Sequence, residues 1–322
     1  MSFTPLKFQI PLAAGGIALM AFNYLQFAVP HGKGLITLAD LNRADLSAWQ
    51  LSFYVPLILL MLAFAVINLG STAIYLRQLV RWVANRDEYR DFINGPPTKS
   101  IGIFVPIASL SMTANVVLAP LAFFIPLLSS NLQTMMLPGL MFFWVLWLML
   151  FRFEFKVMKN GLSRPLDVGK LNFVWLVDVF AFGLVSLTGT GIAALADNSV
   201  LASLAAFSSL FTLTFGGLLL VGKLAYLIYL QIRASALPDK AILPAYFIVI
   251  PITCLFGFSF HRIALYMQTY FSFEMRMFSF LLISSSYVVT IGWGMFCLYL
   301  LGGYFKREFL RCDFSPTQWG IV

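Results

Sequence analysis

Eight long runs of hydrophobic residues, separated by short polar segments, make up most of the chain. Each run is long enough for an α-helix to cross the hydrocarbon core of a bilayer, which takes ~20 residues. The pattern therefore predicts an all-α polytopic membrane protein with a single transmembrane domain over residues 1–322. We expect spans at about residues 8–29, 50–78, 100–127, 136–157, 172–196, 200–231, 242–262 and 277–304.

The composition agrees with this pattern, since 60% of the 322 residues are hydrophobic and only 11% are charged. Sixteen of the 21 Lys and Arg residues lie at the N-terminus or after even-numbered spans. Basic residues gather in cytoplasmic loops, so we expect a multi-pass protein of the inner or plasma membrane with a cytoplasmic N-terminus. The net charge of +8 is then a topology signal, and a nucleic-acid partner is not expected.

Three odd-numbered spans carry nearly the same short phrase around a proline, at Pro11, Pro106 and Pro251. Proline lacks the N–H of the helix ladder, so we expect kinked helices with freed backbone carbonyls. Such groups are tolerated in a membrane where other helices or a water-filled cavity satisfy them. The fifth span has no proline there but carries Asp178 and the flexible segment 188–191.

The chain therefore reads as a series of parallel helical hairpins around a central pore, with even-numbered helices as an outer ring. Small polar residues gather on the odd-numbered spans. Either they hold helices together through hydrogen bonds, or they form an uncharged pore wall that binds ions weakly. With Asp178 as the only fixed acid, such a wall favours anions. Our pore-lining candidates are Pro11, Gly15, Pro106, Ser109, Thr113, Asn115, Asp178, Ser186, Thr188, Thr190, Pro251 and Thr253.

Asp178 lies inside the fifth span and Lys223 inside the sixth, where charge is costly and usually has a purpose. Asp178 and Lys223 lie at similar depth on adjacent antiparallel helices, so we expect an ion pair. The pair is either structural or takes part in substrate passage or proton coupling. Arg262 and Arg276 are expected near the outer mouth, either as solvated loop charges or as groups that attract anions.

Enzyme chemistry finds no match in the chain. The three cysteines show no metal-ligand spacing, and there are only two histidines. No nucleophile elbow, phosphate-binding loop or zinc-protease motif is present. We expect no enzyme activity, no metal and no cofactor.

The C-terminus begins what reads as another helix. Ser315, Pro316 and Gln318 stand where an N-cap, a first-turn proline and a capping-box partner belong, and apolar residues follow. We expect either a short interfacial turn or the opening of a ninth span whose remainder, with any later helices, is missing from the sequence.

Four short sequence segments, together with the order of the spans, resemble the tellurite-resistance/dicarboxylate transporter family. This family includes TehA and the plant slow-type anion channels. The four segments are Phe8-Gln9-Ile10-Pro11, Phe104-Val105-Pro106-Ile107, Ile250-Pro251-Ile252-Thr253 and Leu243-Pro244-Ala245-Tyr246. The resemblance implies ten helices in five hairpins, a pore lined by odd helices in each subunit, and a homotrimer. It also implies passage of anions from chloride and nitrate to sulfite or malate.

Trp319 resembles a tryptophan that opens the family's ninth helix, and the pore-blocking phenylalanine of that helix would follow it. Phe280 belongs to the eighth span and is not that gate.

The leading hypothesis is an anion channel or anion exporter whose partners are a small anion, membrane lipid and two further copies of the chain. One alternative is a proton-coupled dicarboxylate or sulfite transporter in which Asp178 titrates. A second alternative is a membrane subunit that transports nothing.

Overall fold

The computed structural model describes residues 3–32, 34–44, 46–163, 169, 171–234, 237–309 and 317–318, without the side chains of 97 and 98. All regular structure in these residues is helical, and eight segments of them are long and apolar enough to cross a membrane. The predicted all-α polytopic fold is confirmed. The segments are Pro5–Ala28, Ala48–Ala84, Ile101–Phe124, Leu132–Ser163, Phe173–Leu195, Ser199–Ala234, Leu243–Phe271 and Arg276–Leu300.

The spans form an inner and an outer layer. Between 50% and 78% of the apolar window in each odd-numbered span is buried within the protein, against 6% to 33% in each even-numbered span. The inner helices are α1 (Gln9–Ala28), α6 (Phe104–Val116), α10 (Val177–Leu195) and α12 (Val249–Phe271). The outer helices are α3 (Ala48–Ala84), α9 (Leu132–Ser163), α11 (Ser199–Ala234) and α13 (Arg276–Leu300).

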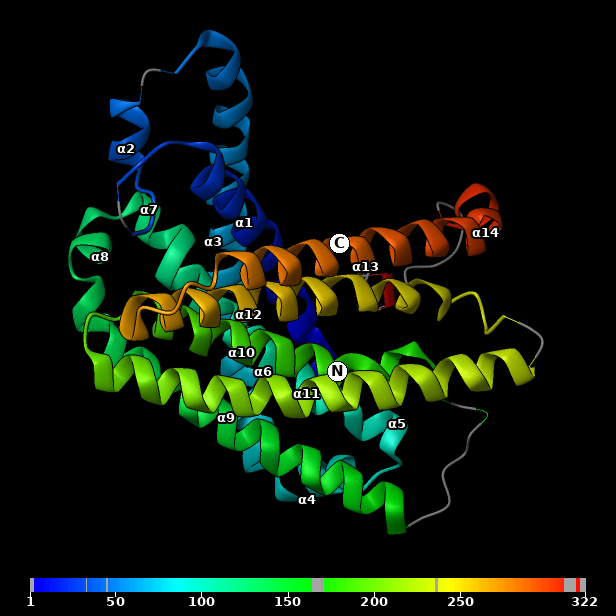
Figure 1. The fold of residues 1–322 in the computed structure, drawn as a ribbon. Helices are drawn as coiled ribbons and strands as arrows, with labels where there is room; N and C mark the ends of the chain where they lie inside the picture. The colour runs from blue at the N-terminus through cyan, green and yellow to red at the C-terminus, as the bar shows by residue number, and fades with distance from the viewer. Residues whose placement is uncertain are drawn as a thin grey trace.

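The inner helices lie side by side in the order α1, α6, α10, α12, with α10 at the centre of the contacts (Figure 1). They form an arc. In the described part of the chain, α1 and α12 are joined by an edge-to-face contact of Phe27 with Phe258, whose ring centroids are 6.3 Å apart. The outer helices pack against the inner ones, and α9 and α11 both contact α10.

The short helices divide between the two ends of the bundle. One end, called here the α2 end, carries α2 (Leu38–Arg43), α7 (Ala122–Phe124) and α8 (Pro126–Ser130). The other, the α4 end, carries α4 (Arg86–Ile93), α5 (Pro97–Ser100) and α14 (Gly302–Arg307). Every inner helix begins towards the α4 end and runs towards the α2 end, so the four share one general direction, although α1 crosses α12 steeply in Figure 1. Which end faces the cytoplasm stays a prediction.

Each inner α-helix follows a short 3₁₀ turn: η1 (Pro5–Phe8), η2 (Ile101–Ile103), η5 (Phe173–Leu176) and η6 (Leu243–Ile248). Pro11, Pro106 and Pro251 are each the third residue of the α-helix that follows. The prolines therefore stand just after the change from 3₁₀ to α-helix, and the expected bend at each one stays a prediction. The prolines lie in the first α turn, where the change of helix type accommodates the missing N–H.

The fifth span keeps this register without a proline. Val179 is the third residue of α10, and its N–H donates to Oδ1 of Asp178 at 2.7 Å. Asp178 thus satisfies the one N–H that the three other inner helices lack at this position. All four inner helices therefore begin in the same way. In three of them a proline lacks the N–H at the third position, and in α10 the side chain of Asp178 accepts it.

The third span contains a break that we did not predict. A π-helical turn, η3 (Val117–Leu121), follows α6 and contains Pro120. Wide turns of this kind form where a proline interrupts the helix ladder, and they often occur beside functional sites.

The predicted start of a ninth span lies almost wholly outside the described residues. Thr317 and Gln318 are described, whereas Ser315, Pro316 and Trp319 are not.

Candidate functional site

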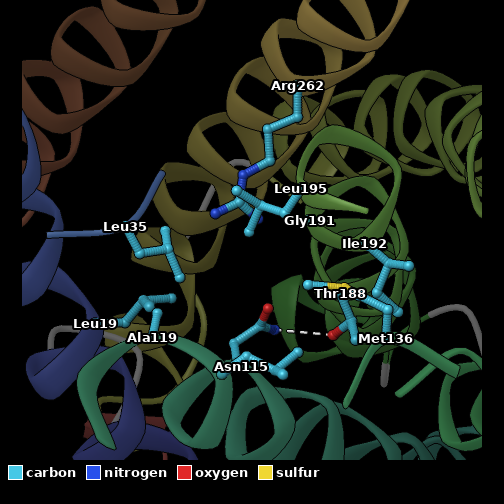
Figure 2. Close-up of a pocket in the computed structure, with 11 residues that line it drawn as sticks. Leu19, Leu35, Asn115, Ala119, Met136, Thr188, Gly191, Ile192, Leu195 and Arg262 are labelled. Atoms are coloured by element: carbon cyan, nitrogen blue, oxygen red, sulfur yellow. Dashed lines mark hydrogen bonds between the residues drawn. The ribbon is translucent and has the colours of Figure 1, made fainter. Parts of the chain in front are cut away.

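A small cavity lies between the inner helices in the half of the bundle nearest the α2 end (Figure 2). All four inner spans contribute to its wall, together with α9 and the loop after α1. Its free volume of about 20 Å³ holds about one water molecule. The lining residues are Leu19, Leu35, Asn115, Leu118, Ala119, Met136, Thr188, Gly191, Ile192, Leu195 and Arg262.

Arg262 is the charged group of this cavity. Figure 2 shows its side chain reaching from α12 into the cavity towards Gly191. Its Nη1 donates to the carbonyl of Leu187 at 3.0 Å, and the guanidinium lies 4.5 Å from the centroid of the Phe258 ring. Within the described part of the chain no carboxylate pairs with it. A guanidinium has five N–H donors, and among the described residues only the carbonyl of Leu187 accepts from this one.

Gly191 makes room for this arginine. A Cβ added at Gly191 would lie 3.0 Å from Nη1 of Arg262. A side chain here would push the guanidinium out of its present place.

The placement of Arg262 corrects the view of it as a solvated loop charge. The seventh span runs to Phe271, nine residues beyond the predicted end at 262, so Arg262 lies inside α12. The polar pair His261 and Arg262 was mistaken for the end of the span. By contrast, Arg276 is exposed at the first residue of α13.

Asn115 and Thr188 place neutral polar groups on the cavity wall. Nδ2 of Asn115 donates to Oγ1 of Thr188 at 2.9 Å and to the carbonyl of Ser111 at 3.0 Å. Ser111 in turn donates to the carbonyl of Leu184 at 2.9 Å. This network ties α6 to α10, so the same side chains hold two helices together and face the cavity.

The other candidate serines and threonines lie elsewhere in the inner layer. Ser109 and Ser186 are fully buried, and their hydroxyls have no hydrogen-bond partner among the described residues. Thr190 donates to the carbonyl of Leu187 on its own helix. None of the three lines the cavity.

Two candidate threonines point to outer helices. Oγ1 of Thr113 lies 3.0 Å from that of Thr72 on α3. Oγ1 of Thr253 lies 2.8 Å from that of Thr290 on α13. Both join an inner helix to its outer neighbour.

Gly15 and the prolines also serve helix packing. A Cβ on Gly15 would lie 2.8 Å from Nδ2 of Asn68 on α3. The same Nδ2 donates to the carbonyl of Pro11 at 2.6 Å. Pro106 is buried and Pro251 is half-buried, each in the first turn of its helix.

A second polar site lies in the opposite half of the bundle, near the α4 end. Nζ of Lys223 on α11 forms an ion pair with Oδ2 of Asp178 on α10, as matched depth predicts. It also donates to the carbonyl of Trp175 at 3.3 Å and lies 4.5 Å from the centroid of that ring. Asp178 is fully buried and Lys223 is nearly so.

Glu154 on α9 is a third ionisable residue of this site, and it was not among the residues predicted from the sequence. Its carboxyl group is fully buried within electrostatic reach of Asp178 and Lys223. The statement that Asp178 is the only fixed acid is therefore wrong. The signal was present, because Glu154 falls inside the predicted span 136–157. Its basic neighbours Arg152 and Lys156 made that stretch resemble an interfacial end.

Metal chemistry finds no support in the described residues, since no three His, Cys, Asp or Glu side chains gather there closely enough to hold an ion. No family model, curated protein or solved structure matches the chain. The resemblance to the tellurite-resistance/dicarboxylate transporter family therefore stays a prediction from the quoted phrases.

Proposed function

We propose that the protein passes small anions across a membrane, as a channel or exporter, through the cavity that Arg262 enters. The carrying observation is a half-buried guanidinium with no carboxylate partner in the described part of the chain. A cation held in a low-dielectric setting attracts an anion far more strongly than the same cation in water. The cavity wall beside it is neutral and polar at Asn115 and Thr188.

The narrow cavity fits a closed state of such a path. Seven apolar side chains line the cavity beside the polar groups, and hydrophobic constrictions close pores by excluding water. The residues are Leu19, Leu35, Leu118, Ala119, Met136, Ile192 and Leu195. Leu35 comes from the loop between α1 and α2, so movement of that loop would widen the cavity from the α2 end.

The test is electrical. The purified chain in liposomes should give a current whose reversal potential follows a chloride or nitrate gradient. Arg262→Gln should reduce the anion current about tenfold, equivalent to about 1.4 kcal/mol of lost stabilisation. Arg262→Lys should retain most of it, and Arg276→Gln, an exposed control, should behave like the wild type.

Three outcomes would contradict the proposal. A reversal potential that follows the cation gradient would exclude anion selectivity. Equal currents in Arg262→Gln and Arg276→Gln would remove Arg262 from the path. No current under any gradient would favour a membrane subunit that transports nothing.

We further propose that the α4 end faces the cytoplasm, on the strength of the basic residues at that end. A cysteine introduced at Ser130 on α8 should react with an impermeant reagent added outside sealed cells. A cysteine at Asp87 on α4 should not react. Labelling at Asp87 would invert the topology.

The proton-coupled alternative retains one specific observation, the buried site of Glu154, Asp178 and Lys223. In that case anion flux would drive proton movement, and a pH gradient alone would drive anion uptake into liposomes.

A further inference from the structure

The site formed by Glu154, Asp178 and Lys223, called here the acid–lysine cluster, contains one acid more than its hydrogen bonds and ion pair account for. Glu154 is fully buried on α9, between α10 and α11. Within the described residues, neither of its carboxyl oxygens makes a hydrogen bond of normal geometry. A buried acceptor without a partner is costly, so the group needs another explanation.

Asp178 already has partners for both of its oxygens. Oδ2 pairs with Lys223, and Oδ1 accepts the N–H of Val179 at 2.7 Å. Lys223 is likewise engaged by Asp178 and by the carbonyl and ring of Trp175. The pair is therefore complete, and no described residue gives Glu154 a cation of its own.

The net charge of the cluster then favours the binding of one further positive charge. Two carboxylates and one ammonium leave a net charge of about −1 in a place that water does not reach, which costs several kcal/mol. A protonated Glu154 removes this net charge. It also turns one orphan acceptor into an O–H donor that faces Asp178.

Among the described residues, no other charged group is placed to do this. Of the elements packed against α9, α10 contributes Asp178 and α11 contributes Lys223. Helix α6 has no titratable residue, and Lys99 of α5 is exposed. Arg152 and Lys156 lie on α9 itself, two residues either side of Glu154, and therefore on other faces of the helix.

We propose that Glu154 and Asp178 share one exchangeable proton, so that the acid–lysine cluster is a proton-binding site. The route for exchange is the slightly exposed edge of Lys223, whose side chain is 8% accessible while that of Asp178 is 0% accessible. Asp178 is the second residue of α10, so the cluster lies close to the α4 end. This proposal does not depend on anion passage.

The test is infrared spectroscopy of the purified full chain in lipid nanodiscs at neutral pH. The wild type should show the C=O stretch of a protonated carboxyl group, and that band should shift in D₂O. Glu154→Gln should lack the band, whereas Glu274→Gln, which changes an exposed acid between α12 and α13, should retain it. Asp178→Asn should also lack it, because Glu154 then becomes the ionised partner of Lys223.

Several results would overturn the proposal. Identical spectra of the wild type and Glu154→Gln would mean that Glu154 carries no proton. A band that does not shift in D₂O would mean a locked proton instead of an exchangeable one. Glutamine reproduces the shape and donor of a protonated glutamate, so failure of Glu154→Gln to fold would also count against it. A band that is present only without Na⁺ would assign the site to that cation instead.

Discussion

The Arg262 cavity and the acid–lysine cluster are built on the same helix but have opposite chemistry. Thr188 and Asp178 are ten residues apart on α10, a rise of about 15 Å. The cavity contains one cation, no carboxylate among the described residues and a small void. The cluster contains two acids and one cation, and Nζ of Lys223 lies 4.5 Å from the centroid of the Trp175 ring. One inner layer therefore has an unpaired cation beside a cavity in one half and an excess acid in the other.

The difference shows that buried charge alone does not identify a transport path. In the cluster, helices α9, α10 and α11 bring two acids and one cation together, and the Asp178–Lys223 pair leaves Glu154 without a hydrogen-bond partner among the described residues. In the cavity, Gly191 leaves space beside Arg262, whose Nη1 donates to the carbonyl of Leu187. What distinguishes the two is the free volume beside the charged group in the cavity.

The largest expected effect is a difference in the free energy of unfolding between variants of Lys223 and variants of Arg262. Lys223→Met leaves two buried acids without a cation and should destabilise the protein by about 3–5 kcal/mol. Arg262→Met removes one hydrogen bond to Leu187 and leaves no buried carboxylate behind, so it should cost about 1 kcal/mol. Denaturant unfolding in detergent micelles measures both. Equal losses would mean that the two sites do not differ as described.

A smaller effect should appear in a double-mutant cycle across the ion pair. Asp178→Asn and Lys223→Gln together should be milder than the sum of the single losses, with a coupling of about 1–3 kcal/mol. The same cycle between Asp178 and Arg262 should be additive, since these residues belong to different sites. Additive losses for Asp178 and Lys223 would rule out the energetic pairing.

A substitution of Gly191 should affect the cavity only by occupying part of its space. Gly191→Ala places a methyl group 3.0 Å from Nη1 of Arg262, so the guanidinium must shift while its charge is kept. We expect anion current to fall several-fold with a stability change within about 1 kcal/mol. Gly217→Ala is the control, because its Cβ would find its first neighbour at 3.9 Å. Equal currents in the two variants would mean that the position of Arg262 does not matter.

The smallest effect concerns an acid outside both sites. Thr37 donates to Oδ2 of Asp40 through its hydroxyl at 2.7 Å and its N–H at 2.8 Å, which lowers the pKa of Asp40 below 3.8. A lowered folded-state pKa means that its stabilisation is present above the unfolded value and is lost only as pH falls through the folded one. Asp40→Asn should therefore cost about 0.5–1 kcal/mol at neutral pH.

Because Asp40 is already ionised there, Asp40→Asn should leave any pH response between about pH 5 and 8 unchanged. Thermal unfolding followed across that range checks this. A response that disappears in Asp40→Asn would move the proton-sensitive group away from the acid–lysine cluster.

Hydrophobic runs were enough to predict the eight spans, because their length matches the bilayer. The small polar residues and prolines on the odd-numbered spans were enough to predict that these spans lie inside. The hydrophobic runs did not predict where the seventh span ends, since His261 and Arg262 resemble an interfacial boundary when packing partners are unknown. The repeated prolines marked a true repeat, but the sequence did not show that each follows a 3₁₀ turn.

The candidate sites were less predictable than the spans. The pairing of Asp178 with Lys223 could be predicted from depth alone. The predicted directions of the fifth and sixth spans place the two residues at a similar distance from the same membrane surface. Depth alone missed Glu154, whose role depends on which face of α9 meets α10. Of twelve pore-lining candidates only Asn115 and Thr188 line the cavity, because rotation about each helix axis decides which residues face inward.

The shared direction of the four inner helices gives the inner layer a built-in electric polarity. Each helix carries about half a positive charge at its start and half a negative charge at its end. Within the inner layer the helix starts are positive at the α4 end and the helix ends are negative at the α2 end, while the outer helices, which run the other way, carry the opposite dipole. If the proposed anion path runs through the inner layer, an anion meets helix starts at one mouth and helix ends at the other, and its current should rectify.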